Sequence, residues 1–209
     1  MLHNGVHLPD WEGHLQKMLD EYPKVNGKAT YQFRKLETVM KLSSVGNVVD
    51  VGAHVGLWSM HLVDYFEKVY AFEPVSEYRK LFRKNVVGNW TLYPYACGDE
   101  TKLVGTEHPN VNSGHTYIVD GTESRMVRLD DMSLKDIAMM KFDCEGYEYF
   151  AIKGGEKLIK EYKPAIIVEQ KPQNKDRYGL SNLKAVDLLK SWGAKLRGTD
   201  CGDYILSWD

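Results

Sequence analysis

The amino-acid sequence predicts an α/β fold, in which a mostly parallel sheet of seven strands carries helices on both faces. Three observations predict it. Short runs rich in β-branched residues alternate with helical patterns along most of the chain. The first of these runs ends in a glycine-containing turn, residues 52–56, from which a helix leaves. The last two runs have no helix between them, so we expect them to pair antiparallel at one edge of the sheet.

The first part of the chain is expected to be helical. A short helix is predicted over 11–22, and apolar residues at helical spacing predict an amphipathic helix over 31–42. We take residues 1–45 as an N-terminal helical segment and residues 46–209 as the main unit. The whole is expected to be a single domain.

Seven runs in the main unit are predicted to be strands, and three stretches are predicted to be helices. The strands are expected at 47–51, 68–72, 91–97, 139–142, 165–168, 195–197 and 203–208. The helices are expected at 57–66, 76–87 and 183–192. Ser76 is the candidate cap at the start of the second helix, and Gly193 closes the third.

Residues 98–137 interrupt this alternation. They are rich in turn-forming glycine and proline, and short strands are expected within them at 113–118 and 125–129. We interpret this stretch as an insertion over the sheet rather than as a second domain.

Composition excludes several classes of protein. The 209 residues include 27 Lys+Arg and 29 Asp+Glu, and a net charge of -2 argues against a dedicated nucleic-acid binder. No run of apolar residues is long enough to span a membrane, and the N-terminus does not resemble a secretory signal. Three widely spaced cysteines fit neither a disulfide framework nor a zinc motif. We therefore expect a cytoplasmic protein that does not insert into membranes.

The turn after the first strand carries the clearest ligand signal. Gly52 and Gly56 allow a ligand to approach the backbone closely at the carboxyl end of a strand. A dinucleotide site needs Gly-x-Gly-x-x-Gly, but His54 stands where the second glycine is required. The carboxylate of Asp50 would repel a pyrophosphate and attract an ammonium group. S-adenosylmethionine carries such a group, so it is the expected cofactor.

A second acidic residue follows the second strand. Glu73 lies 21 residues after Gly52, and its two carboxylate oxygens can accept both ribose hydroxyls of a nucleoside. This feature does not discriminate between cofactors, because nicotinamide enzymes place an acid at the same point. The alternative is that Asp50 only caps the turn and that Glu73 is a solvated strand end.

Acidic residues also follow the fourth and fifth strands. Methyl transfer to oxygen requires that the acceptor hydroxyl lose its proton, and a positioned carboxylate can take it. Asp143 is the first choice for this base, with Glu145 and Glu169 second. Oxygen ligands such as Asp143, Glu169 and Gln170 also suit Mg²⁺ or Ca²⁺, and this alternative stays open, although no metal is expected.

Four other features have two interpretations each. Glu145 and Glu148 can instead fix their turn by pairing with basic residues, namely Lys141, Lys153 or Arg128. His115, in the insertion, is either a base above the acceptor or a surface histidine. The basic run 171–177 either steers an anionic acceptor or is a solvated loop. Residues such as Tyr31, Gln32 and Lys35 either form a lid over the cofactor or belong to the core and surface.

Five blocks of sequence then suggest a family. They are VVDVGAHVGLWSM, VYAFEP, VRLDDM, MKFDCEGYEYFAIKGGEKLI and KPAIIVEQ. In their order and spacing the chain resembles the FkbM family of S-adenosylmethionine-dependent methyltransferases over roughly residues 31–170. The resemblance implies a class I methyltransferase (Rossmann-like) fold with strand order 3-2-1-4-5-7-6. It also implies O-methylation, often of a sugar or polyketide hydroxyl.

The resemblance assigns cofactor contacts to particular positions. The expected contacts are Asp50, Gly52, Ala53, His54 and Gly56 for the methionine part, Glu73 with the adjoining Pro74 for the ribose, and Ala96, Cys97 and Gly98 for the adenine. Asp143 is expected beside the methyl group. The chain departs from the family at His54, where asparagine is common, and at Cys144, where an aliphatic residue is common.

The expected function is therefore methylation of a small-molecule acceptor, with a sugar-like hydroxyl as the favoured class and no nucleic-acid partner. Two alternatives stay open. One is a binding module that keeps the fold and the cofactor without turnover, and the other is a nicotinamide-dependent oxidoreductase. The oligomeric state is not predicted.

Overall fold

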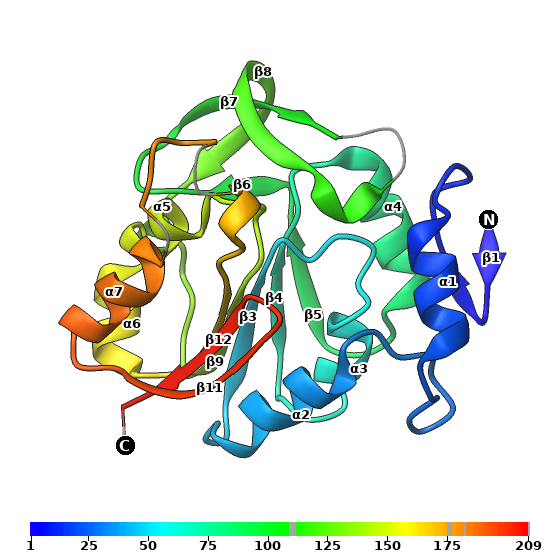
Figure 1. Ribbon diagram of the computed structural model, residues 1–209, viewed down its shortest axis with the longest axis horizontal. Coiled ribbons are helices and arrows are strands. Elements are labelled where there is room, and N and C mark those ends of the chain that lie inside the picture. Colours follow the sequence, from blue (N-terminus) through cyan, green and yellow to red (C-terminus); the bar gives the residue numbers. More distant parts are fainter. Residues whose placement is uncertain (109–111, 175–176, 182, 209) are drawn as a thin grey trace.

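The computed structural model describes residues 1–108, 112–174, 177–181 and 183–208. At its centre is a seven-stranded sheet, which Figure 1 shows among the helices. The strand order is β11-β12-β10-β9-β3-β4-β5, and all strands are parallel except β12. The strands are β3 (Asn47–Val51), β4 (Val69–Phe72), β5 (Trp90–Tyr93), β9 (Ile137–Phe142), β10 (Ala165–Glu169), β11 (Lys195–Asp200) and β12 (Asp203–Ser207). When these seven strands are numbered 1 to 7 in chain order and the sheet is read from the β5 edge, the order is 3-2-1-4-5-7-6. The predicted α/β class and mostly parallel sheet are confirmed.

The central strands are buried along their whole length. Every residue of β3, β4, β9 and β10 is buried, as expected for parallel strands covered on both faces. Adjacent residues of one strand contribute to opposite layers, since Val48 belongs to one hydrophobic cluster and Val49 to the other. Long apolar stretches in the sequence therefore mark the middle of the sheet.

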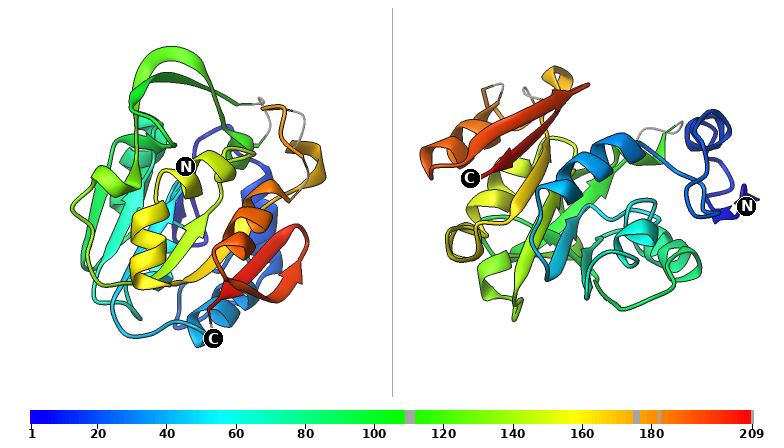
Figure 2. Two further views of the ribbon diagram at one scale, coloured as in Figure 1. Left: turned by 90° about the vertical axis from the view of Figure 1, so that its left-hand side faces the viewer. Right: turned by 90° about the horizontal axis from the view of Figure 1, so that it is seen from below.

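Helices cover both faces (Figure 2). One layer contains α1 (His14–Glu21), α2 (Phe33–Lys41), α3 (Ser59–Leu62) and α4 (Ser76–Asn85). The other contains α5 (Glu148–Lys153), α6 (Glu156–Tyr162) and α7 (Lys184–Ser191). Among the described residues no helix is long and apolar enough to cross a bilayer.

A smaller sheet stands over the carboxyl edge of the main one (Figure 1). Its strands are β6 (Tyr95–Cys97), β7 (Lys102–Glu107) and β8 (Tyr117–Val127), in the order β6-β8-β7. Short elements complete the fold: the hairpin β1 (Leu2–His3) and β2 (Val6–His7), and the 3₁₀ turns η1 (Ser113–His115), η2 (Leu129–Asp131) and η3 (Pro172–Asn174).

Several predicted boundaries were wrong. The strand expected at 91–97 divides at Pro94 into β5, in the main sheet, and β6, in the smaller one, because proline has no N–H to continue a ladder. The strands expected at 113–118 and 125–129 are replaced by η1 and the single long strand β8.

The helical predictions also need correction. Ser76 is the first residue of α4 rather than its cap, which is Val75. The helix expected over 57–66 shortens to α3, and two helices, α5 and α6, were not predicted. In contrast, the predicted antiparallel edge pair is present as β11 and β12.

Candidate active site

A cleft lies at the carboxyl ends of the central strands, beneath the smaller sheet. Most of the residues predicted to bind the cofactor line it: Asp50, Gly52, Ala53, His54, Glu73, Pro74, Ala96, Cys97 and Asp143. The other predicted catalytic residues, Glu145 and Glu169, line it too. Gly56 and Gly98 are outside this lining.

A buried ion pair holds the base of the cleft. The Nζ of Lys141 lies 3.1 Å from Oδ1 of Asp50, and the Ser59 hydroxyl donates to Oδ2 of Asp50 at 2.7 Å. The side chains of Asp50 and Lys141 are 1% and 7% exposed. Burial disfavours the Lys141 ammonium, but the charges of Asp50 and Asp143 outweigh burial and raise the pKa of Lys141. Asp50 is therefore a paired carboxylate, not the free anion that the sequence suggested.

The turn after β3 packs directly against the turn after β9, the neighbouring strand of the sheet. Gly52 has φ +76°, and a Cβ there would overlap the carbonyl oxygen of Asp143, so only glycine fits. Gly56 has φ +90°, and a Cβ there would meet Val86 and Phe82 of the α4 region. Gly56 is therefore required for packing against the α4 region, at a point away from the cleft.

His54 occupies the centre of this turn in a left-handed conformation, with φ +50°. Its ring packs edge-on against Tyr78, with a centroid distance of 4.4 Å. Burial lowers the pKa of His54 to about 4, so the imidazole is neutral at physiological pH. Its Nε2 is buried and has no hydrogen-bond partner among the described residues.

Glu73 is only 4% exposed, so it is not a solvated strand end. Its two carboxylate oxygens accept the backbone N–H groups of His54 and Val75, both at 2.8 Å. Burial raises the pKa of Glu73 to about 7. Each oxygen retains acceptor capacity for a ligand hydroxyl, so Glu73 can join the turn to a bound ribose.

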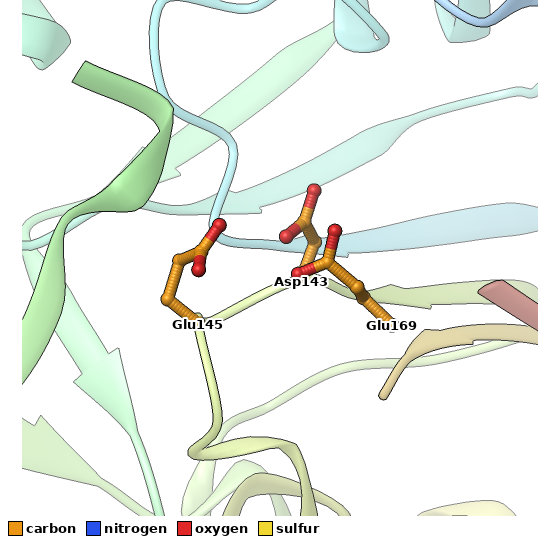
Figure 3. A group of neighbouring side chains, drawn as sticks. All are labelled: Asp143, Glu145 and Glu169. Carbon is orange, nitrogen blue, oxygen red and sulfur yellow. The ribbon is translucent and has the colours of Figure 1, made fainter. Parts of the chain in front are cut away.

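The three predicted catalytic carboxylates lie together (Figure 3). One oxygen each from Asp143, Glu145 and Glu169 lies within 4.8 Å of the other two. Burial and the charge of Asp143 raise the pKa of Glu145 to about 7 and raise that of Glu169 well above its ordinary value. Glu169 pairs with Lys171, and Asn174 donates to Glu145 at 3.0 Å.

Gln170 does not join this group. Its side-chain oxygen accepts the N–H groups of Ala185 and Val186, at 2.8 and 3.0 Å, at the start of α7. In the alternative cation site of Asp143, Glu169 and Gln170, the Gln170 oxygen is therefore engaged by α7 instead.

Glu148 fixes the turn after β9, but not through the ion pairs that the sequence suggested. One of its oxygens accepts the N–H groups of Cys144 and Gly146, at 2.8 and 3.0 Å. Lys153 pairs instead with Asp99, at 2.7 Å.

The upper wall of the cleft joins distant parts of the chain. Glu12, just before α1, is fully buried and accepts hydrogen bonds from both the backbone N–H and the hydroxyl of Ser113. This contact holds the N-terminal segment against the insertion, so that Tyr31 and His115 both line the cleft. Lys35 lies elsewhere, in a buried pair with Asp203.

Sequence reasoning missed the pairing of Lys141 with Asp50, and it missed the roles of Glu12 and Ser113. Lys141 had a readable signal, because a lysine inside a strand of buried apolar residues needs a carboxylate partner. In the register of β3 and β9, Lys141 lies opposite Asp50. Glu12 and Ser113 had no such signal, since they are 101 residues apart.

The end of the cleft predicted to hold adenine is largely apolar and aromatic. Ala96 and Cys97 line it together with Phe72 and Tyr95. Burial raises the pKa of the Cys97 thiol well above its ordinary value, which keeps it protonated and unreactive. Gly98 packs against Met126 instead.

Comparison with known proteins gives one family match. The model of the methyltransferase FkbM domain matches residues 50–196. No curated protein matches the sequence.

Solved structures show a similar fold. The methyltransferase FkbM from Methylobacillus flagellatus KT is 21% identical with a TM-score of 0.52, and the match covers 78% of this chain and 43% of that one. This chain thus spans less than half of that protein, and the likeness concerns the fold alone.

Two other solved structures are more distant. Precorrin-6y C5,15-methyltransferase from Geobacter metallireducens GS-15 is 18% identical with a TM-score of 0.49, over 91% of this chain and 95% of that one. The N-methyltransferase NodS from Bradyrhizobium japonicum WM9, in complex with S-adenosyl-l-homocysteine, is 9% identical with a TM-score of 0.49, over 90% and 88%.

Proposed function

The chain belongs to the FkbM methyltransferase family, and from this premise we propose that it transfers the methyl group of S-adenosylmethionine to a hydroxyl of a small, sugar-like acceptor. One observation carries the proposal. The buried carboxylate of Glu73, held by the glycine turn, lines the same cleft as Asp143, Glu145 and Glu169. A nucleoside and an acceptor hydroxyl can therefore be bound side by side.

The proposed cofactor position follows the lining of the cleft. Glu73, beside Pro74, receives the ribose hydroxyls, and the apolar end at Ala96 and Cys97 receives the adenine. The methionine part lies against the turn of Gly52, Ala53 and His54, close to the Asp50–Lys141 pair. The methionine part is a zwitterion and therefore suits this pair. Its ammonium group can approach the carboxylates of the cleft, and its own carboxylate can approach Lys141.

The proposed chemistry is an in-line displacement. The acceptor oxygen attacks the methyl carbon, the bond from carbon to sulfur breaks, and a carboxylate takes the hydroxyl proton. Asp143 is the first candidate for that carboxylate, since its side chain is 33% exposed and lines the cleft. Glu145 and Glu169 are the second candidates.

The lining of the cleft supports a polar, hydroxyl-bearing acceptor. Tyr31, His115 and Tyr117 line the cleft together with the three carboxylates, and such groups donate to and accept from hydroxyls. We extend the proposal to residues 46–209 as the cofactor-binding domain, with residues 1–45 as its N-terminal segment.

The test has two stages. Calorimetry should show that the protein binds S-adenosylmethionine in preference to NAD, and a labelled methyl donor should then transfer label to an acceptor in fractionated sugar and small-molecule extracts. Binding of NAD alone would exclude the proposal, whereas cofactor binding without transfer to any fraction would indicate a binding module.

A further inference from the structure

We propose that the carboxylates of Asp143, Glu145 and Glu169, called here the carboxylate cluster, bind a divalent cation of the Mg²⁺ or Mn²⁺ type. One oxygen from each lies within 4.8 Å of the others. Asp143 and Glu145 come from the turn after β9, and Glu169 is the last residue of β10. Figure 3 shows the carboxylates of Asp143 and Glu169 side by side, with that of Glu145 facing them. A set of oxygen ligands suits such hard cations.

A second observation independently indicates a missing ligand. Glu169 is 4% exposed, and while its Oε1 pairs with Lys171, its Oε2 has no hydrogen-bond partner among the described residues. A buried carboxylate oxygen without a partner is costly, and such groups in native proteins commonly mark an ion or water site. A cation held by the carboxylate cluster would supply the missing partner.

The balance of charge around the cluster supports the same conclusion. The carboxylate cluster and Asp50 together carry four negative charges when ionised, and the ammonium groups that pair with them are those of Lys141 and Lys171. Two positive charges against four negative ones leave -2. The nearby guanidinium of Arg177 donates to the backbone carbonyl of Glu145 rather than to a carboxylate. One divalent cation would therefore neutralise the excess.

This inference differs from the sequence-based expectation that the site holds no metal. Cation binding itself does not depend on the proposed function, but the role given to the cation rests on that proposed function. Bound beside an acceptor hydroxyl, the cation would lower the pKa of that hydroxyl and orient it toward the methyl carbon. Glu145 and Glu169 would then act by holding the cation, while Asp143 would hold it through one carboxylate oxygen and accept the hydroxyl proton with the other.

The experiment measures cation binding directly. Mn²⁺ is titrated into the purified protein, and free Mn²⁺ is followed by electron paramagnetic resonance, with calorimetry of Mg²⁺ as the second readout. We expect one Mn²⁺ per chain, an affinity about a hundredfold lower in Glu169→Gln, and no change in the matched control Asp131→Asn, whose side chain is 62% exposed and lies outside the cluster.

Two results would overturn the inference: no bound Mn²⁺ at millimolar concentration, or an unchanged affinity in Glu169→Gln. Circular dichroism verifies folding, and Glu145→Gln replaces the first variant if that one does not fold, with the same expected loss. S-adenosylmethionine affinity is measured on the same samples. If the unaltered protein binds the cofactor but no cation, only this inference is contradicted. If it binds the cation but not the cofactor, only the proposed function is contradicted.

Discussion

Replacing Lys141 by methionine tests whether the buried ion pair with Asp50 holds the glycine turn against the sheet. The two charged groups are 3.1 Å apart, and their side chains are 1% and 7% exposed. Methionine preserves most of the volume of lysine but leaves the Asp50 carboxylate buried with only the Ser59 hydroxyl as a partner. Removing one partner of a buried pair costs about 3–5 kcal/mol. In a chain of this size that loss lowers the melting temperature by roughly 6–20 °C.

The assay is urea unfolding at pH 7, with far-ultraviolet circular dichroism as the signal that reports unfolding. Lys153→Met is the matched control, because it removes a lysine from a more exposed pair with Asp99 and should cost at most about 1 kcal/mol. In the double variant Asp50→Asn with Lys141→Met, the loss should be smaller than the sum of the two single losses. Additive losses, or a cost below about 1 kcal/mol for Lys141→Met, would refute the assigned role.

Four further predictions concern the turn and the carboxylates. Glu73→Ala should weaken S-adenosylmethionine binding by more than about tenfold in calorimetry, since the proposed acceptor for the ribose hydroxyls is lost. Unchanged affinity would contradict that proposed role. Burial raises the pKa of Glu73 from 4.5 to about 7, so the stability that it contributes is full below pH 4.5 and is lost as the pH rises through 7. Between pH 4.5 and 7 this group should lower the free energy of unfolding of the wild-type protein by up to about 3 kcal/mol, and Glu73→Gln should not show this fall. Identical pH profiles of the two proteins in urea unfolding would contradict the raised pKa. Gly52→Ala should destabilise the protein by more than about 2 kcal/mol. The control is Gly5→Ala, because Gly5 has a similar φ of +84° but open space around it, and this change should cost less. Equal losses in the two variants would disprove the overlap at Gly52. Asp143→Asn should fold and bind cofactor but lose methyl transfer, and intact turnover would exclude Asp143 as the base.

The sequence predicted those parts of the fold that local physics determines. The β-branched run at 47–51 and the unbroken apolar run at 165–168 became β3 and β10, because parallel central strands are buried on both faces. The insertion was predicted less well. Its strand β8 runs through Gly121, and its pairing with β6 and β7 depends on tertiary contacts that override local turn propensity.

The site shows the same division between local and long-range information. The turn of 52–56 and the carboxylates at strand ends could be read from the sequence, because parallel strands bring their carboxyl ends to one edge of a sheet. The contact between Glu12 and Ser113 could not, since it joins an N-terminal segment to an insertion about half the chain away. Neither residue type indicates a partner at that distance.

The Asp50–Lys141 pair changes the physical reason for preferring a sulfonium cofactor over a dinucleotide. A paired carboxylate repels a pyrophosphate less strongly than a free one, so repulsion by Asp50 is a weak discriminator. Two other features of the cleft discriminate better. The ring of His54 occupies the centre of the turn, where a dinucleotide site requires bare backbone. When ionised, the carboxylate cluster adds negative charge that the lysines do not balance. This excess opposes a diphosphate and favours a cationic methyl donor or a divalent cation.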